Sequence, residues 1–253
     1  MEKKQKLKIK LYFSDYFDVS EEVIKQYGAF NISLVADLPL FIDPFLLFHS
    51  KKTEYQELHE EIIEYLRFLK NKSSSSINPG LLSAWYRFPE VKQNWFGFTN
   101  NGNGGRGLGN KFASALNGNL ENIFRDFGKE VVTTSSHLEK LCLIKEGVGR
   151  DSISDFTTNL IKYYLLNYTQ DFAVENINKE KLREITVRKV KFNYTTEVWE
   201  DRKYLLPYID GDYIILTPRD ILTKDDIWIN KTDLFDHFED IPYAIQMNNF
   251  AHS

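Results

Sequence analysis

The sequence predicts an α+β protein, with a mixed α/β arrangement as the alternative, in which helices pack on a central mixed sheet. Two patterns predict this class: an amphipathic helical segment at residues 53–70, and short β-rich runs from residue 185 onward. Hydrophobic residues make up 42% of the 253 residues and aromatic residues 15%, enough for an aromatic-rich core. We expect a single compact unit spanning 1–253, with the serine-rich loop at 71–80 as a candidate boundary between two lobes.

The N-terminal region is predicted to begin with a strand at residues 6–13. Apolar and charged residues alternate there with a period of two, as in a strand with one buried face. The lysines on the other face would discourage pairing at an open edge. A short helix should follow, because Ser20 can cap its first turn and Glu21 and Glu22 suit that position.

Residues 30–48 are predicted to be extended, because Pro39 and Pro44 interrupt any regular helix in this aromatic stretch. The next segment, 53–70, has helical spacing, with an apolar stripe at steps of three and four and glutamates off that stripe. The stripe consists of Tyr55, Leu58, Ile62, Leu66 and Leu69.

The stretch 139–172 is predicted to organise the chain. A short apolar segment leads into a turn at 147–155 that holds two glycines, an arginine and two aspartates, and this turn opens into the most hydrophobic helix candidate. Three β-rich runs follow at 185–194, 204–208 and 212–217. The dipeptide Asp210-Gly211, between the last two runs, predicts a hairpin turn.

Charge and composition exclude several classes of protein. The net charge of -4, from 32 basic and 36 acidic residues, argues against a protein that coats nucleic acid, although a local basic groove is compatible with it. No stretch approaches the ~18 apolar residues of a membrane span, and no signal-peptide pattern is present. The single cysteine, Cys142, excludes an intrachain disulfide. We therefore expect a cytoplasmic protein with no membrane association and no disulfide-linked partner.

The first candidate site combines Asp151 and Asp155 with Glu139. We expect Asp151 in the turn and Asp155 near the start of the following helix, where paired carboxylates and a third acid can hold Mg²⁺ for phosphoryl transfer. Asp151 and Asp155 would be the metal ligands, and all three acids would be the catalytic groups. The alternative is structural: Asp155 or Ser154 caps the helix, and Arg150 pairs with Asp151 at the surface.

The second candidate site is the glycine-rich loop at 100–111. Residues 102–107 match G-x-G-x-x-G and precede a helical pattern, so backbone amides and a helix N-terminus could bind phosphate. The predicted phosphate-binding residues are Gly104, Gly105, Arg106, Gly107 and Lys111. The loop departs from the P-loop pattern and lacks a framing βαβ unit, so a flexible loop or an active-site lid is the alternative. A nucleotide or single strand stacked on Trp95 or Phe98 would suit an anion-binding loop here.

Three segments of the chain resemble a group of uncharacterised bacterial proteins found in anti-phage defence gene clusters. They are residues 37–48, the end of the glycine loop at Gly107-Leu108-Gly109, and residues 147–155. The resemblance implies a role directed at nucleic acid and assigns no function to individual residues.

Two functional hypotheses follow. The first is a bacterial defence-associated, Mg²⁺-dependent phosphodiesterase or nuclease. In it Asp151 and Asp155 hold the metal, with Glu139 as a candidate third acid, and Arg106 and Lys111 contact phosphate. The second is a non-catalytic recognition or adaptor subunit of a multi-protein assembly. Nucleic acid and other protein subunits are therefore the expected partners.

Overall fold

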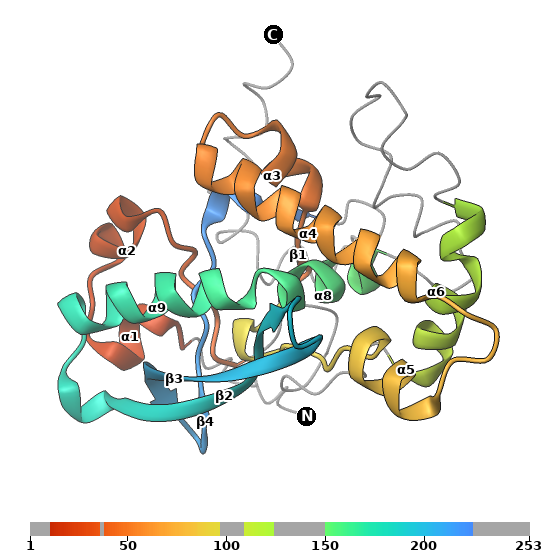
Figure 1. Ribbon diagram of the computed structural model, residues 1–253. Coiled ribbons are helices and arrows are strands. Elements are labelled where there is room, and N and C mark those ends of the chain that lie inside the picture. The colour runs from red at the N-terminus through yellow and green to blue at the C-terminus, as the bar shows by residue number, and fades with distance from the viewer. Residues whose placement is uncertain (1–10, 36–37, 97–108, 124–149, 225–253) are drawn as a thin grey trace, which may run out of the picture.

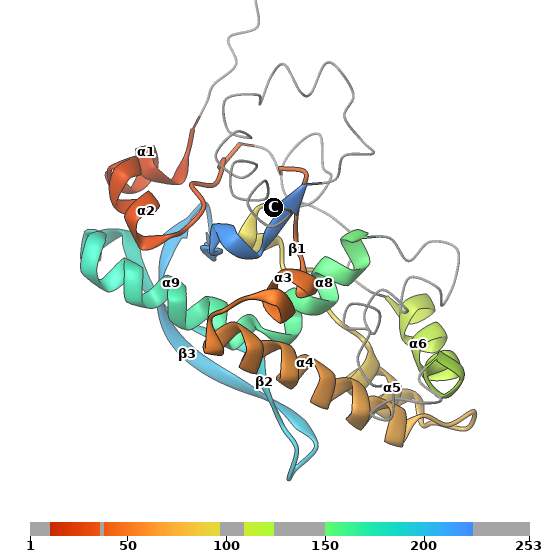
Figure 2. The same ribbon diagram turned by 90° about the horizontal axis from the view of Figure 1, so that it is seen from above.

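The computed structural model describes residues 11–35, 38–96, 109–123 and 150–224. Within them, helices make up most of the chain up to residue 176, most strands follow, and the named strands pair antiparallel, which confirms the α+β class (Figure 1). Helices α1 and α2 lie at one end of the molecule and α5 and α6 at the other, with α9 and α4 extending between these ends (Figure 2). No helix in these ranges is long and apolar enough to cross a membrane.

The N-terminal segment differs in part from the predicted strand and helix. Helix α1 (Phe13–Phe17) begins where the last residue of the predicted strand was placed, while residues 6–10 lie outside the described residues. Helix α2 (Glu21–Tyr27) follows as predicted, and the Ser20 hydroxyl accepts a hydrogen bond from the Val23 amide at 3.3 Å. This bond satisfies one of the amides that the first helical turn leaves without a partner.

Pro44 begins a helix, contrary to the extended structure predicted for residues 30–48. Strand β1 (Leu40–Ile42) is followed by helix α3 (Pro44–His49), with Asp43 as its cap. The Asp43 carboxylate accepts from the Phe45 amide at 2.9 Å. Proline is tolerated at the first helical position because no backbone donor is needed there, so the prediction gave Pro44 too much weight as a helix breaker.

The next helices form one side of the core. Helix α4 (Thr53–Lys72) confirms the amphipathic segment, and α5 (Pro79–Tyr86) packs against it across the serine-rich loop. The Tyr86 hydroxyl donates to the Leu69 carbonyl at 2.5 Å, and the Tyr65 hydroxyl donates to the Trp85 carbonyl at 2.7 Å. The short 3₁₀ helix η1 (Lys92–Asn94) and helix α6 (Asn110–Ile123) follow.

The C-terminal part holds most of the strands and the predicted apolar helical segment, which the structure divides into two helices instead of one. Helices α8 (Arg150–Leu160) and α9 (Lys162–Asn176) are separated at Ile161, and η2 (Lys179–Lys181) leads into the sheet. Strands β2 (Leu182–Asn193), β3 (Val198–Ile209) and β4 (Asp212–Tyr213) form an antiparallel sheet in that order. The last elements are η3 (Arg219–Ile221) and β5 (Leu222–Lys224), which pairs antiparallel with β1.

The strands form two small sheets in the described residues rather than the single central mixed sheet that we predicted. Consecutive strands β2, β3 and β4 are joined by tight turns, and such connections produce antiparallel neighbours. The turn predicted at Asp210-Gly211 is confirmed: both residues have positive φ, 49° and 88°, as a two-residue hairpin turn requires.

An aromatic cluster fills the space between α4, α5, α8 and the β2–β3 hairpin. The Tyr65 ring lies 4.9 Å from Phe192 and 5.3 Å from Trp199, and Phe88 lies 4.9 Å from Phe156. Tilted and edge-on contacts of this kind add to the stabilisation from apolar burial. The aromatic-rich core predicted from composition is therefore present.

Helix α9 lies across the hairpin and is tied to the segment that follows β4 by one buried threonine (Figure 1). The Thr169 hydroxyl donates to the Leu165 carbonyl at 2.6 Å and accepts from the Leu216 amide at 2.9 Å, and its side chain is fully buried. Thr157 of α8 is equally buried, but its hydroxyl has no hydrogen-bond partner within the described part of the chain.

These two threonines give a matched test of the fold. We expect Thr169→Val to lower the free energy of unfolding by about 1–3 kcal/mol, because the Leu216 amide would lose its acceptor. Thr157→Val should leave the free energy of unfolding unchanged or raise it, because it removes a buried hydroxyl that has no partner. Urea denaturation of both variants checks this, and equal losses for the two would contradict the hydrogen-bond account.

Candidate functional site

The structure describes some of the predicted site residues and leaves others outside its described ranges. Asp151 and Asp155 lie in α8, and Lys111 lies in the first turn of α6. The remaining predicted site residues lie outside the described residues: Glu139, Gly104, Gly105, Arg106 and Gly107.

Asp151 and Asp155 belong to the same helix, which corrects the prediction that a turn holds one and a cap the other. Both aspartates lie within helix α8 (Arg150–Leu160), four residues apart in the sequence. Among the residues that the structure describes, no group of three or more acidic, histidine or cysteine side chains could hold a metal ion. The third predicted acid, Glu139, lies outside the described residues, so the three-acid Mg²⁺ site stays a prediction.

Two other polar residues of α8 have structural roles. The Ser154 hydroxyl accepts from the Ile42 amide of β1 at 2.9 Å, so Ser154 links α8 to β1 instead of capping the helix as the structural alternative held. The Asn159 amide donates to the Pro89 carbonyl at 2.7 Å. Asp155 is half-buried one turn before Asn159, and its backbone carbonyl accepts from the same amide at 2.8 Å.

The described end of the glycine loop borders a cleft rich in basic side chains. Gly109, immediately before α6, lines a cleft of about 550 Å³, and its carbonyl accepts the first helical hydrogen bond from Ala113. Arg87, at the end of α5, and Arg188 and Lys189, from β2, line the same cleft. Residues about a hundred positions apart in the sequence therefore meet at one place.

An irregularity in β2 brings Arg188 and Lys189 to this cleft. Val187 pairs with Arg202 and Lys191 with Glu200, so residues 188–190 all lie opposite Asp201. Lys189 adopts the left-handed conformation, with φ of 51°, and its amide donates to an Asp201 carboxylate oxygen at 3.0 Å. Such bulges redirect side chains out of the regular alternation of a strand.

A buried lysine of α9 supports the bulge through a hydrogen bond to the backbone of β2. The Lys162 side chain, only 4% exposed, donates from its Nζ to the Arg188 carbonyl at 2.8 Å. Burial, and then the nearby charge of Lys189, lower the pKa of Lys162 to about 8, although the Asp201 carboxylate partly offsets both effects. The Lys162 ammonium therefore binds a backbone carbonyl at the cost of its own hydration.

The cleft carries more positive than negative charge. In the described ranges, no carboxylate forms an ion pair with the side chain of Arg87, Arg188 or Lys189. Glu90 also lines the cleft and interacts with another group of the protein. Burial, and then the adjacent Arg87 guanidinium, lower the pKa of Lys189. Three cations held close together without ion-pair partners favour the binding of an anion.

Sequence reasoning did not find these three cations. Arg87, Arg188 and Lys189 belong to no motif, and only the fold brings α5 beside the bulge: the Lys189 Nζ donates to the Ala84 carbonyl of α5 at 3.4 Å. The one signal in the sequence was Gly109, at the end of the predicted glycine loop. Trp95, proposed above for base stacking, is half-buried and packs against the hydrophobic core, and Phe98 lies outside the described residues.

The buried Lys162 predicts a specific pH dependence. Its pKa falls from 10.5 to about 8 on folding, so between these values the unfolded chain binds more protons and stability rises with pH. Relative to Lys162→Met, the free energy of unfolding of the wild type should therefore increase by about 2 kcal/mol from about pH 7 to about pH 9.5.

Urea denaturation at the two pH values measures this difference, and the exposed Lys179→Met is the matched control. The control should differ from the wild type by the same amount at both pH values. A pH-independent difference for Lys162→Met as well would show that folding does not dehydrate this ammonium.

Comparison with known proteins identifies the family but no activity. The model of a family described as a domain of unknown function, DUF8370, matches residues 18–230. The chain therefore belongs to the DUF8370 family. No curated protein and no solved structure matches it.

Proposed function

We propose that this member of the DUF8370 family binds nucleic acid, with the basic cleft contacting the phosphate backbone. The observation that carries the proposal is the convergence of Arg87, Arg188 and Lys189, without carboxylate ion pairs in the described ranges, on one cleft of a chain whose net charge is -4. Such a cluster destabilises the free protein through mutual repulsion, and an anion that neutralises it is bound more tightly for that reason.

Phosphate suits the cleft because both arginines can form paired hydrogen bonds with its oxygens, while Lys189 supplies a compact charge. The predicted phosphate contacts at Arg106 and Lys111 belong to the segment that ends at this cleft, and they would extend the basic surface beyond one phosphate. The resemblance to proteins of anti-phage defence gene clusters favours a nucleic-acid backbone over a small phosphate ester. A cytoplasmic location is part of the proposal.

Charge removal at the cleft tests the binding. Arg87→Gln and Arg188→Gln should each weaken the binding of labelled single-stranded and duplex nucleic acid to a similar degree for every sequence. Each should also reduce by about one the slope of log affinity against log salt, because one phosphate contact is lost. Fluorescence anisotropy over a salt series measures both quantities.

The matched control for this experiment is Arg183→Gln, which removes the same charge from the same strand, β2, outside the cleft. Its affinity and salt slope should equal those of the wild type. If the wild type does not bind at low salt, or if the control weakens binding as much as the cleft variants do, the proposed interface is wrong.

Metal-dependent cleavage of the bound nucleic acid is a second candidate function, favoured by the position of α8. Asn159 bonds to Pro89, which lines the cleft, and Asp155 lies one turn earlier on the same helix. Asp151, Asp155 and Glu139 would hold Mg²⁺, which when bound would polarise a phosphoryl oxygen and activate water. If these acids form no metal site, the alternative is a non-catalytic recognition or adaptor subunit that works together with other proteins.

Cleavage assays separate these two activities. With Mg²⁺ or Mn²⁺ and labelled DNA and RNA, we expect cleavage by the wild type and a loss of about 100-fold or more for Asp151→Asn and Asp155→Asn, with binding retained. Circular dichroism checks that both variants fold. If the wild type binds but does not cleave with either metal, the phosphodiesterase is excluded and the recognition subunit is supported.

A further inference from the structure

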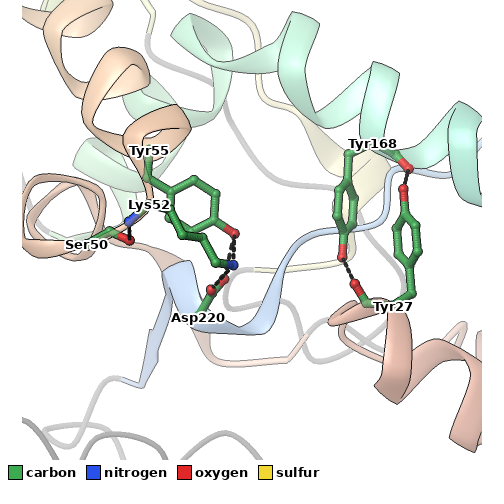
Figure 3. A network of polar contacts seen from close by, with 6 residues as sticks. All are labelled: Tyr27, Ser50, Lys52, Tyr55, Tyr168 and Asp220. Carbon is green, nitrogen blue, oxygen red and sulfur yellow. Dashed lines mark hydrogen bonds and ion pairs between the residues drawn. The ribbon is translucent and has the colours of Figure 1, made fainter.

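A second cleft, of about 1120 Å³, opens where α2, α4, α9 and η3 meet, and none of its lining residues belongs to the basic cleft. Five tyrosines line it, drawn from three helices: Tyr27, Tyr55, Tyr163, Tyr164 and Tyr168. Figure 3 shows two of its sides, with Tyr55, Lys52 and Asp220 on one and Tyr27 and Tyr168 on the other.

Hydrogen bonds to the protein fix the orientation of these rings. The Tyr27 hydroxyl donates to the Tyr168 carbonyl at 2.8 Å, and the Tyr168 hydroxyl donates to the Tyr27 carbonyl at 3.2 Å, a reciprocal pair that joins α2 to α9 (Figure 3). The Tyr55 hydroxyl donates to an Asp220 carboxylate oxygen at 2.7 Å. The Tyr27 and Tyr168 rings also pack on each other, with a centroid distance of 4.5 Å. With these hydroxyls bonded to the protein, a ligand would meet the parts of the ring faces that border the cleft.

The rings also support one another. Tyr164 stacks on Tyr168 with a centroid distance of 6.0 Å and an interplanar angle of 29°, and its edge meets Tyr55 at 6.1 Å and 89°. The Tyr163 hydroxyl donates to a Glu61 carboxylate oxygen at 3.0 Å. The tyrosine side chains are therefore already ordered in the free protein, so ligand binding costs little free energy for ordering them.

Four carboxylates and three cationic side chains line this cleft, so its formal charge is slightly negative. The Lys52 ammonium is neutralised by Asp220 at 2.6 Å, while Lys25 and Arg219 interact with other groups of the protein. In contrast, the exposed Glu54, Glu57 and Asp171 line the cleft and form no ion pair with any described residue. A ligand in the cleft would meet aromatic faces together with negative charge.

Two further observations describe the electrostatic surroundings of the rings. Burial, followed by the carboxylates of Asp171 and Glu175, raises the pKa of Tyr27 to about 12. The Lys52 ammonium already lies over the Tyr55 ring, 4.6 Å from its centroid, so the cleft contains one cation–π contact of its own.

We propose that the tyrosine-lined cleft binds a small organic cation with a methylated ammonium group, which the ring faces of Tyr164 and Tyr168 contact while Glu54 and Asp171 supply countercharge. Ring faces attract such a cation through their quadrupole, and the methyl groups gain from leaving water. A phosphate-bearing ligand is disfavoured by the same carboxylates. The inference stands independently of nucleic-acid binding at the basic cleft.

Calorimetric titration of the full chain with choline, and with its neutral isostere 3,3-dimethylbutan-1-ol, tests the charge requirement. The two probes share shape and differ in one positive charge, so we expect choline to bind roughly ten times more tightly. Equal affinities, or no binding by either choline or tetramethylammonium, would overturn the proposal.

Two sets of variants then locate the site. Tyr168→Leu should weaken choline binding roughly fivefold and Tyr168→Phe should not, because only the ring face is needed.

In case the leucine variant does not fold, the exposed pair Glu54→Gln/Asp171→Asn gives an independent test and should weaken binding by a similar factor. Its matched control, Glu180→Gln/Asp210→Asn, removes the same charge outside the cleft and should leave binding unchanged. If the two double variants weaken choline binding equally, the cation binds at another site.

Discussion

Burial of α9 between the β2–β3 hairpin and the N-terminal helices is the constraint on which both clefts depend. Three polar side chains bond this helix to neighbouring backbone along its length: Lys162 to the Arg188 carbonyl at 2.8 Å, Thr169 to the Leu216 amide at 2.9 Å, and Gln170 to the Leu205 amide at 2.7 Å. Buried backbone groups must be paired, so these side chains fix the position of the helix more narrowly than apolar packing alone. The bulge supported by Lys162 and the tyrosines of the same helix take their positions from it.

Helix α9 contributes to two clefts whose charged side chains are predominantly of opposite sign. Near the start of α9, Lys162 supports a bulge that directs Arg188 and Lys189 toward a basic cleft. Further along, Tyr164 and Tyr168 form an aromatic wall bordered by carboxylates. Local fields of opposite sign can coexist because solvent screens charges within about 10 Å at ordinary ionic strength. The net charge of -4 therefore says little about the anions that a single cleft can bind.

Local patterns predicted much of the fold from the sequence. The α4 stripe, the Ser20 cap and the Asp210-Gly211 turn each depend on residues within a few positions of one another, and all three are present. Pro44 was misjudged because a proline that ends one helix can begin another, and the choice depends on the Asp43 cap. The arrangement of the strands was also misjudged, because pairing between β1 and β5 joins segments about 180 residues apart, and such pairing leaves no local signal in either segment.

The basic cleft and the tyrosine cleft were beyond sequence reasoning for related reasons. A bulge at Lys189 follows from the side chains of Lys162 and Asp201, which lie on other elements, so no spacing around residue 189 indicates it. Tyrosines at helical spacing are typical of a core, and Tyr164 and Tyr168 differ from core tyrosines only through the cleft that the fold leaves beside them. By contrast, the aspartates at 151 and 155 were visible in the sequence, and both belong to helix α8.

The measurement that tests the central claim most directly is arginine-selective chemical footprinting of the full chain with and without saturating single-stranded nucleic acid, read by mass spectrometry. If the basic cleft binds the phosphate backbone, Arg87 and Arg188 lose reactivity on binding while Arg183, on the same strand outside the cleft, keeps it. Undiminished reactivity of Arg87 and Arg188 in a saturated complex would contradict the account and direct the search for the interface to another surface.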